Sequence, residues 1–279
     1  MNLSVMLFPF DGELVSGQIT PGEVVQTLKA HGATGVEAMT SFGDSHPEHW
    51  EALMAAIAAE GLQHVCLDVP ANFVWTTDAQ RQQVMDGVKR GLDFAASVRC
   101  PLVLLPGSGP AEGMSNEEGR QRYGEGLGEA AALCAEYGIT ATIEDFGVTP
   151  RFSCRSDNVL EIVEATGRDD VRLTWDNGNF ILADEDPLHA WEAFAPLTAH
   201  VHIKDFALDP TGQAGLRSPA GKAFVGCEIG AGEARVVDCL QTVKHSSYTG
   251  WISLEISVGP SLDAARQGLD FILKAYNEA

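Results

Sequence analysis

The sequence predicts a single α/β domain over residues 1–279, folded as a closed (β/α)8 TIM barrel with a parallel eight-stranded core. Eight short apolar or alternating runs occur along the chain, and each is followed by a segment with helical periodicity or helix-capping residues. The length of 279 residues suits one barrel of this kind. A doubly wound open sheet is the alternative, but the segment after the first run, FPFDGELVSG, lacks the G-x-G-x-x-G turn typical of that fold.

The first half of the chain supplies four pairs of strand and helix. Thr20 and Pro21 open the first helix, and Glu23 completes a capping box. The run PLVLL is apolar throughout, as in strands that are buried on both faces of a parallel sheet. The predicted strands are 3–7, 35–39, 64–69 and 101–105, and the predicted helices are 20–31, 47–61, 78–98 and one that ends at Gly138.

The second half repeats this alternation. Ser156 is the expected cap of one helix, and Asp186 with Pro187 begins the next. A long polar, glycine-rich segment over 208–233 separates the seventh strand from its helix. The predicted strands are 139–144, 171–176, 199–206 and 251–256, and the predicted helices are 156–166, 186–196, 236–245 and 261–276.

Composition excludes several classes of function. A formal net charge of -21 repels polyanions, so we expect no nucleic-acid partner. No apolar run is long enough to span a membrane, and the N-terminal MNLSVMLFPF lacks the basic region of a signal peptide. The 6 cysteines form no C-x-x-C pair, so we expect reduced thiols in a cytoplasmic protein without disulfides or structural zinc. The sequence does not decide whether the chain forms a homo-oligomer.

The stretch AHVHIKDF at 199–206 carries the clearest chemical signal. At strand periodicity His200, His202 and Lys204 lie on one face. His202, near the end of the strand, suits a divalent metal ion. Because the ends of barrel strands meet at one mouth, carboxylates at the ends of other runs are its expected partners. The predicted metal ligands are Glu144, Asp176, His202 and Glu255.

Three carboxylates and one imidazole form an oxygen-rich set that suits one Mn or Mg ion, with Co as a possible substitute. A hydroxy-ketone chelated there would enolise, with the metal stabilising the enediolate. Glu144 and Glu255 are the predicted catalytic residues, which would remove and return a proton from opposite faces of the substrate. Return to the same carbon gives epimerisation, return to its neighbour gives isomerisation, and loss of a β-hydroxyl gives dehydration.

The motifs TIEDF, TWDNGN, HVHIKDF and SLEIS together resemble the xylose-isomerase-like barrels of sugar isomerases and epimerases, a family that includes ketose 3-epimerases, hydroxypyruvate isomerase, inosose dehydratase and endonuclease IV. The resemblance implies a metal-dependent sugar or sugar-phosphate isomerase or epimerase. The epimerases usually have a histidine at the position of Asn179, and an arginine that often follows the strand-seven histidine is absent here. The extra metal-binding histidines of endonuclease IV are also absent, which argues against DNA repair.

Four further residues are candidates for substrate binding. Glu37 ends the second strand and would bind a hydroxyl or form a salt bridge at the rim. Lys204 would hold a phosphate, steady the enediolate or pair with a barrel carboxylate. The complete set of predicted substrate-binding residues is Glu37, Asn179, Lys204 and Arg217. Two alternatives remain beside the isomerase, namely a metal-dependent dehydratase of a keto-polyol and a non-catalytic barrel that binds metal or sugar.

Overall fold

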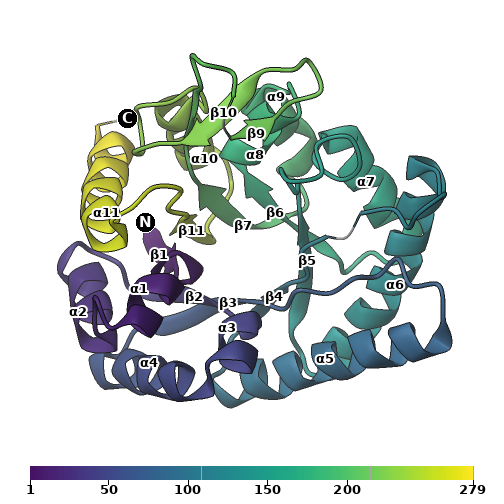
Figure 1. The fold of residues 1–279 in the computed structure, drawn as a ribbon, viewed down its shortest axis with the longest axis horizontal. Helices are drawn as coiled ribbons and strands as arrows, with labels where there is room; N and C mark the ends of the chain where they lie inside the picture. The colour runs from purple at the N-terminus through teal and green to yellow at the C-terminus, as the bar shows by residue number, and fades with distance from the viewer. Residues whose placement is uncertain (108, 214, 279) are drawn as a thin grey trace.

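Eight parallel strands close into one barrel in the computed structural model, which describes residues 1–107, 109–213 and 215–278 (Figure 1). The strands follow the order β1-β11-β7-β6-β5-β4-β3-β2 around the barrel, which confirms the predicted fold class. Their bounds agree with the predicted runs to within a few residues. They are β1 Asn2–Met6, β2 Gly35–Met39, β3 Gln63–Asp68, β4 Leu102–Leu104, β5 Thr140–Glu144, β6 Arg172–Asp176, β7 Thr198–Ile203 and β11 Trp251–Leu254.

Helices surround this barrel (Figure 1). The predicted capping box of Thr20 and Glu23 is present. The short helices α1, α3 and α8 were not predicted, and α3 and α8 begin directly after the strands β2 and β6. The helices are η1 Phe8–Phe10, α1 Asp11–Ser16, α2 Pro21–Ala30, α3 Thr40–Ser45, α4 Pro47–Glu60, α5 Asp78–Ser97, α6 Asn116–Glu136, α7 Ser156–Ala165, α8 Asn177–Leu182, α9 Pro187–Phe194, α10 Val236–His245 and α11 Ser261–Asn277.

The two faces of the strands are buried in different surroundings. On β7, Val201 and Ile203 are fully buried in the apolar core, whereas His200 and His202 alternate with them and point into the barrel. Neighbouring strands also place polar side chains inside, and Thr174 Oγ1 donates to Thr142 Oγ1 at 3.0 Å. The interior of this barrel is therefore polar in its middle, unlike the layers of branched aliphatic residues that usually fill such barrels.

A small antiparallel sheet, with the order β8-β10-β9, extends from the end of β7. Its strands are β8 Phe206–Leu208, β9 Leu216–Arg217 and β10 Ala223–Gly226, in a segment where the sequence predicted no strand beyond Phe206. The seventh strand was predicted to continue to Phe206, but β7 ends at Ile203. Asp205 gives the reason, because its carboxylate accepts hydrogen bonds from the backbone N–H groups of Phe206, Gly230, Gly232 and Ala234 and so turns the chain.

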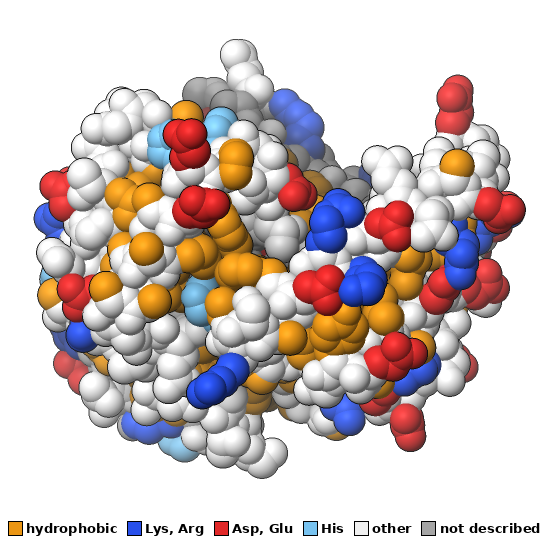
Figure 2. Space-filling view, turned by 90° about the horizontal axis from the view of Figure 1, so that it is seen from below, with side chains coloured by type: hydrophobic (Ala, Val, Ile, Leu, Met, Phe, Trp, Pro, Cys, Tyr) orange, Lys and Arg blue, Asp and Glu red, His pale blue; other side chains and the backbone are white. Residues whose placement is uncertain are grey.

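The surface carries few basic side chains. On the face shown in Figure 2, Lys and Arg side chains are interspersed with acidic ones and do not gather into one basic area. This distribution agrees with the net charge of -21, while the expected absence of a nucleic-acid partner remains a prediction. Within the described part of the chain, no helix has the length and apolar composition needed to cross a bilayer. The 6 cysteines are all free thiols.

Candidate functional site

The four predicted metal ligands lie together, with the three carboxylates converging on the Nδ1 of His202. This nitrogen lies 3.7 Å from Glu144 Oε2 and 3.8 Å from Asp176 Oδ2. It lies 3.6 Å from Glu255 Oε2. The adjacency of β11, β7, β6 and β5 in the barrel explains this convergence, since each of these strands ends at the same mouth and presents one of the four side chains.

The segment after β6 holds Asp176 in place. Asp176 caps α8, and its Oδ1 accepts hydrogen bonds from the backbone N–H groups of Gly178 and Asn179 at 2.8 and 3.1 Å. Its Oδ2 is thereby left to face His202. A side chain at Gly178 would lie 2.5 Å from Lys204 Cγ, so a glycine is required here for Lys204 to reach the site.

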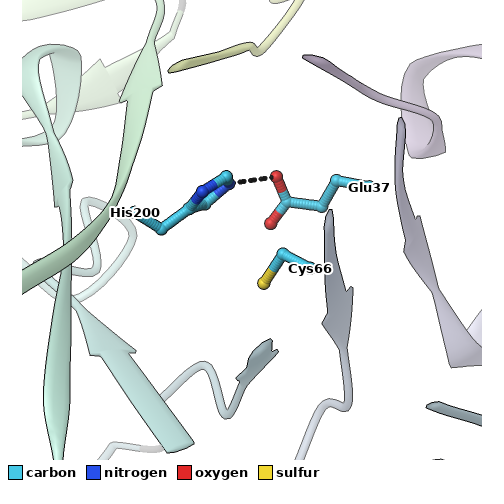
Figure 3. A group of neighbouring side chains, drawn as sticks. All are labelled: Glu37, Cys66 and His200. Carbon is cyan, nitrogen blue, oxygen red and sulfur yellow. Dashed lines mark hydrogen bonds and ion pairs between the residues drawn. The ribbon is translucent and has the colours of Figure 1, made fainter. Parts of the chain in front are cut away.

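Glu37 orients His202 from below. The two oxygens of its carboxylate lie 3.0 and 3.1 Å from His202 Nε2, and one of them lies 2.8 Å from His200 Nε2. Figure 3 shows Glu37 and His200 pointing towards one another, with Cys66 beside them. An ionised carboxylate only accepts hydrogen bonds, so Nε2 of His202 is a protonated nitrogen. The Nδ1 of the neutral ring is therefore the nitrogen with a lone pair for a ligand.

The charges of this buried cluster shift its pKa values. Burial lowers the pKa of His202, but the carboxylates of Glu37, Glu144 and Glu255 outweigh burial and raise it to about 9. Burial raises the pKa of Glu37, but His202 and His200 outweigh it and hold that pKa well below its usual range. Burial raises the pKa of Glu144 to about 8. Without a metal ion, a protonated His202 therefore offsets part of the acidic charge.

Lys204 supplies the second positive charge. Its Nζ lies 2.8 Å from Asp176 Oδ2 and 2.8 Å from Glu255 Oε1. Burial lowers the pKa of Lys204, but these carboxylates outweigh burial and raise it above its ordinary value. The prediction left open a role at the enediolate or an ion pair within the barrel, and the structure shows the ion pair.

The donor set fits a divalent metal ion. His202 Nδ1 is buried without a hydrogen-bond partner among the described residues, which is costly unless another group satisfies it, whereas the buried Asp176 Oδ2 is paired with Lys204 Nζ. Glu144, Asp176 and His202 each offer a ligand atom, and these atoms lie within 4.8 Å of one another. The separations of 3.6 to 3.8 Å are too long for hydrogen bonds but suit atoms that ligate one ion between them.

A cavity of about 710 Å³ opens above this cluster. Glu144 and Glu255 reach it, whereas Asp176 and His202 lie beneath its floor and are fully buried. Of the predicted substrate-binding residues, Asn179 and Lys204 line the cavity.

The other two predicted substrate-binding residues lie elsewhere. Glu37 is buried below His202 and does not line the cavity, because its carboxylate is engaged by the two histidines. Arg217 is exposed on β9, where its guanidinium donates a hydrogen bond to the carbonyl oxygen of Gly212. In this structure neither side chain is placed to touch a substrate.

Three residues that support the site were not predicted. Asp145 accepts a hydrogen bond from the backbone N–H of Asp176 at 3.0 Å. Asn177 joins two loops, since its amide oxygen accepts from Lys204 N at 3.0 Å and its amide nitrogen donates to the carbonyl of Ala234 at 2.8 Å. Asp205 is the third. Each of the three is adjacent in sequence to a predicted functional residue, in the motifs EDF, WDNGN and IKDF. This adjacency is the sequence feature from which their supporting roles could have been predicted.

Comparison with known families gives one match over most of the chain. Residues 25–275 match the family model described as xylose isomerase-like TIM barrel. The L-ribulose-5-phosphate 3-epimerase UlaE of Salmonella paratyphi A is 24% identical over 211 residues, which cover 74% of this chain and 68% of that protein.

Two further proteins are similar over a larger share of the chain. The inosose dehydratase of Geobacillus thermodenitrificans is 20% identical over 264 residues, covering 89% of this chain and 86% of that protein. Among solved structures, the IOLI protein with a bound zinc atom superposes with a TM-score of 0.70 at 16% identity, covering 100% of this chain and 96% of that one. At such identity the structural likeness concerns the fold.

Proposed function

Because the chain belongs to the family of xylose isomerase-like TIM barrels, we propose that it is a divalent-metal-dependent isomerase or epimerase that moves a proton next to the carbonyl of a hydroxy-ketone sugar. The observation that carries this proposal is that the four candidate ligands differ in their access to the cavity. Two buried ligands, Asp176 and His202, lie below the cavity, and two carboxylates, Glu144 and Glu255, reach into it.

Glu144, Asp176, His202 and Glu255 would hold the metal ion. Their three carboxylates and one imidazole favour Mn or Mg, and the zinc in the similar IOLI structure shows that a barrel of this fold accommodates a divalent ion. When bound, the ion supplies a Lewis acid that polarises the substrate carbonyl and stabilises the negative charge that develops on its oxygen.

Glu144 and Glu255 are the proton-transfer residues of the proposal. In the barrel order, β7 and β6 lie between β11 and β5, so the two glutamates approach from opposite sides of the His202 and Asp176 pair. A substrate between them presents one face to each carboxylate. One glutamate then removes the proton next to the carbonyl, and the other returns a proton from the opposite face, which inverts the carbon centre.

Lys204 and Asn179 complete the polar part of the site. Burial raises the pKa of Glu255, and the ammonium of Lys204 at Glu255 Oε1 opposes this rise and favours the ionised, proton-accepting form of the carboxylate. The amide of Asn179 is held at the cavity wall by its place in the first turn of α8, and it has both a donor and an acceptor for a substrate hydroxyl. An amide is neither a general acid nor a general base near neutral pH, so Asn179 binds and orients the substrate in this proposal.

Dehydration of a keto-polyol is the second candidate. The similarity to inosose dehydratase, over 89% of this chain, favours it. Both reactions begin with removal of a proton next to a carbonyl, and they differ in whether the enediolate is reprotonated or loses a β-hydroxyl. Product analysis by NMR after incubation with a ketose panel and Mn distinguishes inversion from loss of water.

Replacement of each glutamate by glutamine tests the proposal. Glu144→Gln and Glu255→Gln keep an oxygen ligand but remove a proton acceptor, so turnover should fall far more than metal affinity. In D₂O each variant should still exchange the substrate proton on one face without converting the substrate. Glu185→Gln, a buried carboxylate bound to Ser156 away from the cavity, is the control and should retain turnover. Near wild-type turnover in both site variants, with metal bound, would refute the proton-transfer roles.

A further inference from the structure

The cavity is larger than a monosaccharide requires. Sites that hold a drug-sized ligand measure about 300–1,000 Å³, and a hexose of about a dozen heavy atoms is smaller than such a ligand. The cavity above Glu144 and Glu255 measures about 710 Å³. The cavity therefore has room for a second group on the substrate, beyond the part that reaches the two glutamates.

The charges around the cavity disfavour an anionic second group. Among the described lining residues, Lys204 is the only cation, and its Nζ is already 2.8 Å from each of two carboxylates. Three acidic residues line the same cavity, namely Asp68, Glu144 and Glu255. A phosphate would enter this acidic surrounding without a free arginine or lysine to pair with, and so would lose hydration without compensation.

Apart from Asn72 and Asn179, the remaining lining side chains are apolar. Met6 ends β1 and Phe8 begins η1, while Met39 ends β2 and Phe146 follows β5. The other apolar lining side chains are Pro70, Ala71, Leu104, Pro106, Val148, Phe206 and Leu216. Sugar hydroxyls gain little from such walls, whereas an apolar group gains free energy in proportion to the area that it buries there.

Two of these side chains are unusually exposed. Val148 has 57% of its surface exposed and Leu216 has 36%, which places both among the few large apolar residues that the described chain leaves to solvent. Both line the cavity although Val148 follows β5 and Leu216 belongs to β9. An apolar ligand group that covers them would remove this exposed area from water.

We propose that the substrate is a neutral hydroxy-ketone that carries an apolar substituent, such as an alkyl or aryl group, and is not a phosphorylated sugar. This inference rests on the proposed function, since the hydroxy-ketone part would lie at Glu144 and Glu255. The substituent would occupy the outer half of the cavity, against Phe8 and Phe146 and under the exposed Val148 and Leu216. The UlaE epimerase, whose name specifies a phosphorylated substrate, would differ from this chain in that respect.

A matched series of three ketoses tests the inference. The three compounds share one hydroxy-ketone part and differ only at the far end, which carries a free hydroxyl, a phosphate or a phenyl ether. Binding of each to the Mn-loaded protein is measured by titration calorimetry, and exchange of the proton next to the carbonyl is followed by NMR in D₂O. The phenyl ether should bind about 10-fold to 100-fold more tightly than the free hydroxyl, and the phosphate more weakly than both.

Val148→Asp probes the outer half directly, because this exposed side chain lies at the cavity and its replacement should not disturb the core. The variant should lose the preference for the phenyl ether and retain the affinity for the free hydroxyl. Val237→Asp, at another exposed valine, on α10 and outside the cavity lining, should change neither.

The outcomes separate this inference from the function on which it rests. Equal or tighter binding of the phosphate, or no gain from the phenyl group, would overturn the inference even if all three compounds exchange their proton. Absence of exchange in every compound that binds would instead overturn the isomerase proposal, while the order of binding affinities would still decide the nature of the substituent.

Discussion

Replacing Glu37 by glutamine tests whether a residue outside the cavity controls metal binding. In the structure, Glu37 is the carboxylate that accepts hydrogen bonds from His202 Nε2 at 3.0 Å and His200 Nε2 at 2.8 Å. Glutamine has the same shape but only one acceptor oxygen and no charge. The fold should survive, because His200 has a buried Nδ1 without a hydrogen-bond partner among the described residues and can carry its proton there instead.

The expected loss of Mn affinity follows from the hydrogen bond that the substitution weakens. A hydrogen bond to a charged group contributes about 1.5–3 kcal/mol, and this one fixes the tautomer in which His202 Nδ1 is free to ligate. Glu37→Gln should therefore weaken Mn binding about 10-fold to 100-fold. Titration calorimetry with Mn at pH 7.5 measures the affinity, and circular dichroism checks the fold.

Glu185→Gln is the matched control for this experiment. It also removes the charge of a buried carboxylate, but Glu185 binds the backbone N–H of Ser156 at the start of α7 and does not contact His202. Its Mn affinity should equal that of the wild type. If Glu37→Gln folds and binds Mn as tightly as Glu185→Gln does, the assignment of Glu37 to the orientation of His202 is wrong.

Two further predictions concern the metal ion. Adding Mn should raise the melting temperature and chelation should reverse the rise, since an ion at 100 times its Kd stabilises the folded state by about 2.7 kcal/mol; an unchanged melting temperature would count against the site. In the metal-free protein, the pKa of His202 is raised to about 9 from 6.5, so its contribution to the free energy of unfolding is fully present below pH 6.5 and is lost as the pH rises through about 9. Urea unfolding between pH 6 and 9 should show this loss, and Mn affinity should rise over the same interval because the ion displaces the proton on Nδ1; a flat profile of affinity against pH would contradict it.

The barrel and its four candidate ligands were predictable because each signal is local. Every barrel strand carries its own apolar pattern, and Glu144, Asp176, His202 and Glu255 each stand at or near the end of one strand. Because the ends of barrel strands meet at one mouth, the four residues can be predicted to lie close together even when no contact between them is known. The structure adds that only two of the four, Glu144 and Glu255, line the cavity.

The environment of Glu37 was not predictable from local patterns. Its partners His200 and His202 lie 163 and 165 residues away in the sequence, and only closure of the barrel brings them together. A carboxylate that ends a strand has the same sequence pattern whether it faces the substrate or a buried histidine. The small sheet was missed for a different reason, since strands such as Leu216–Arg217 are too short to show an alternation of polar and apolar residues.

The small sheet β8-β10-β9 has a consequence for how such a barrel acquires new specificities. It begins two residues after Lys204, and it contributes Phe206 and Leu216 to the cavity wall. Asp205 anchors the return of this segment at the backbone N–H groups of Gly230, Gly232 and Ala234, which follow β10, so these hydrogen bonds do not involve the residues between β8 and β10. We therefore expect that loops of other lengths and compositions can replace the residues between β8 and β10. Such loops would recognise other substrates, while the barrel strands keep the candidate metal ligands in place.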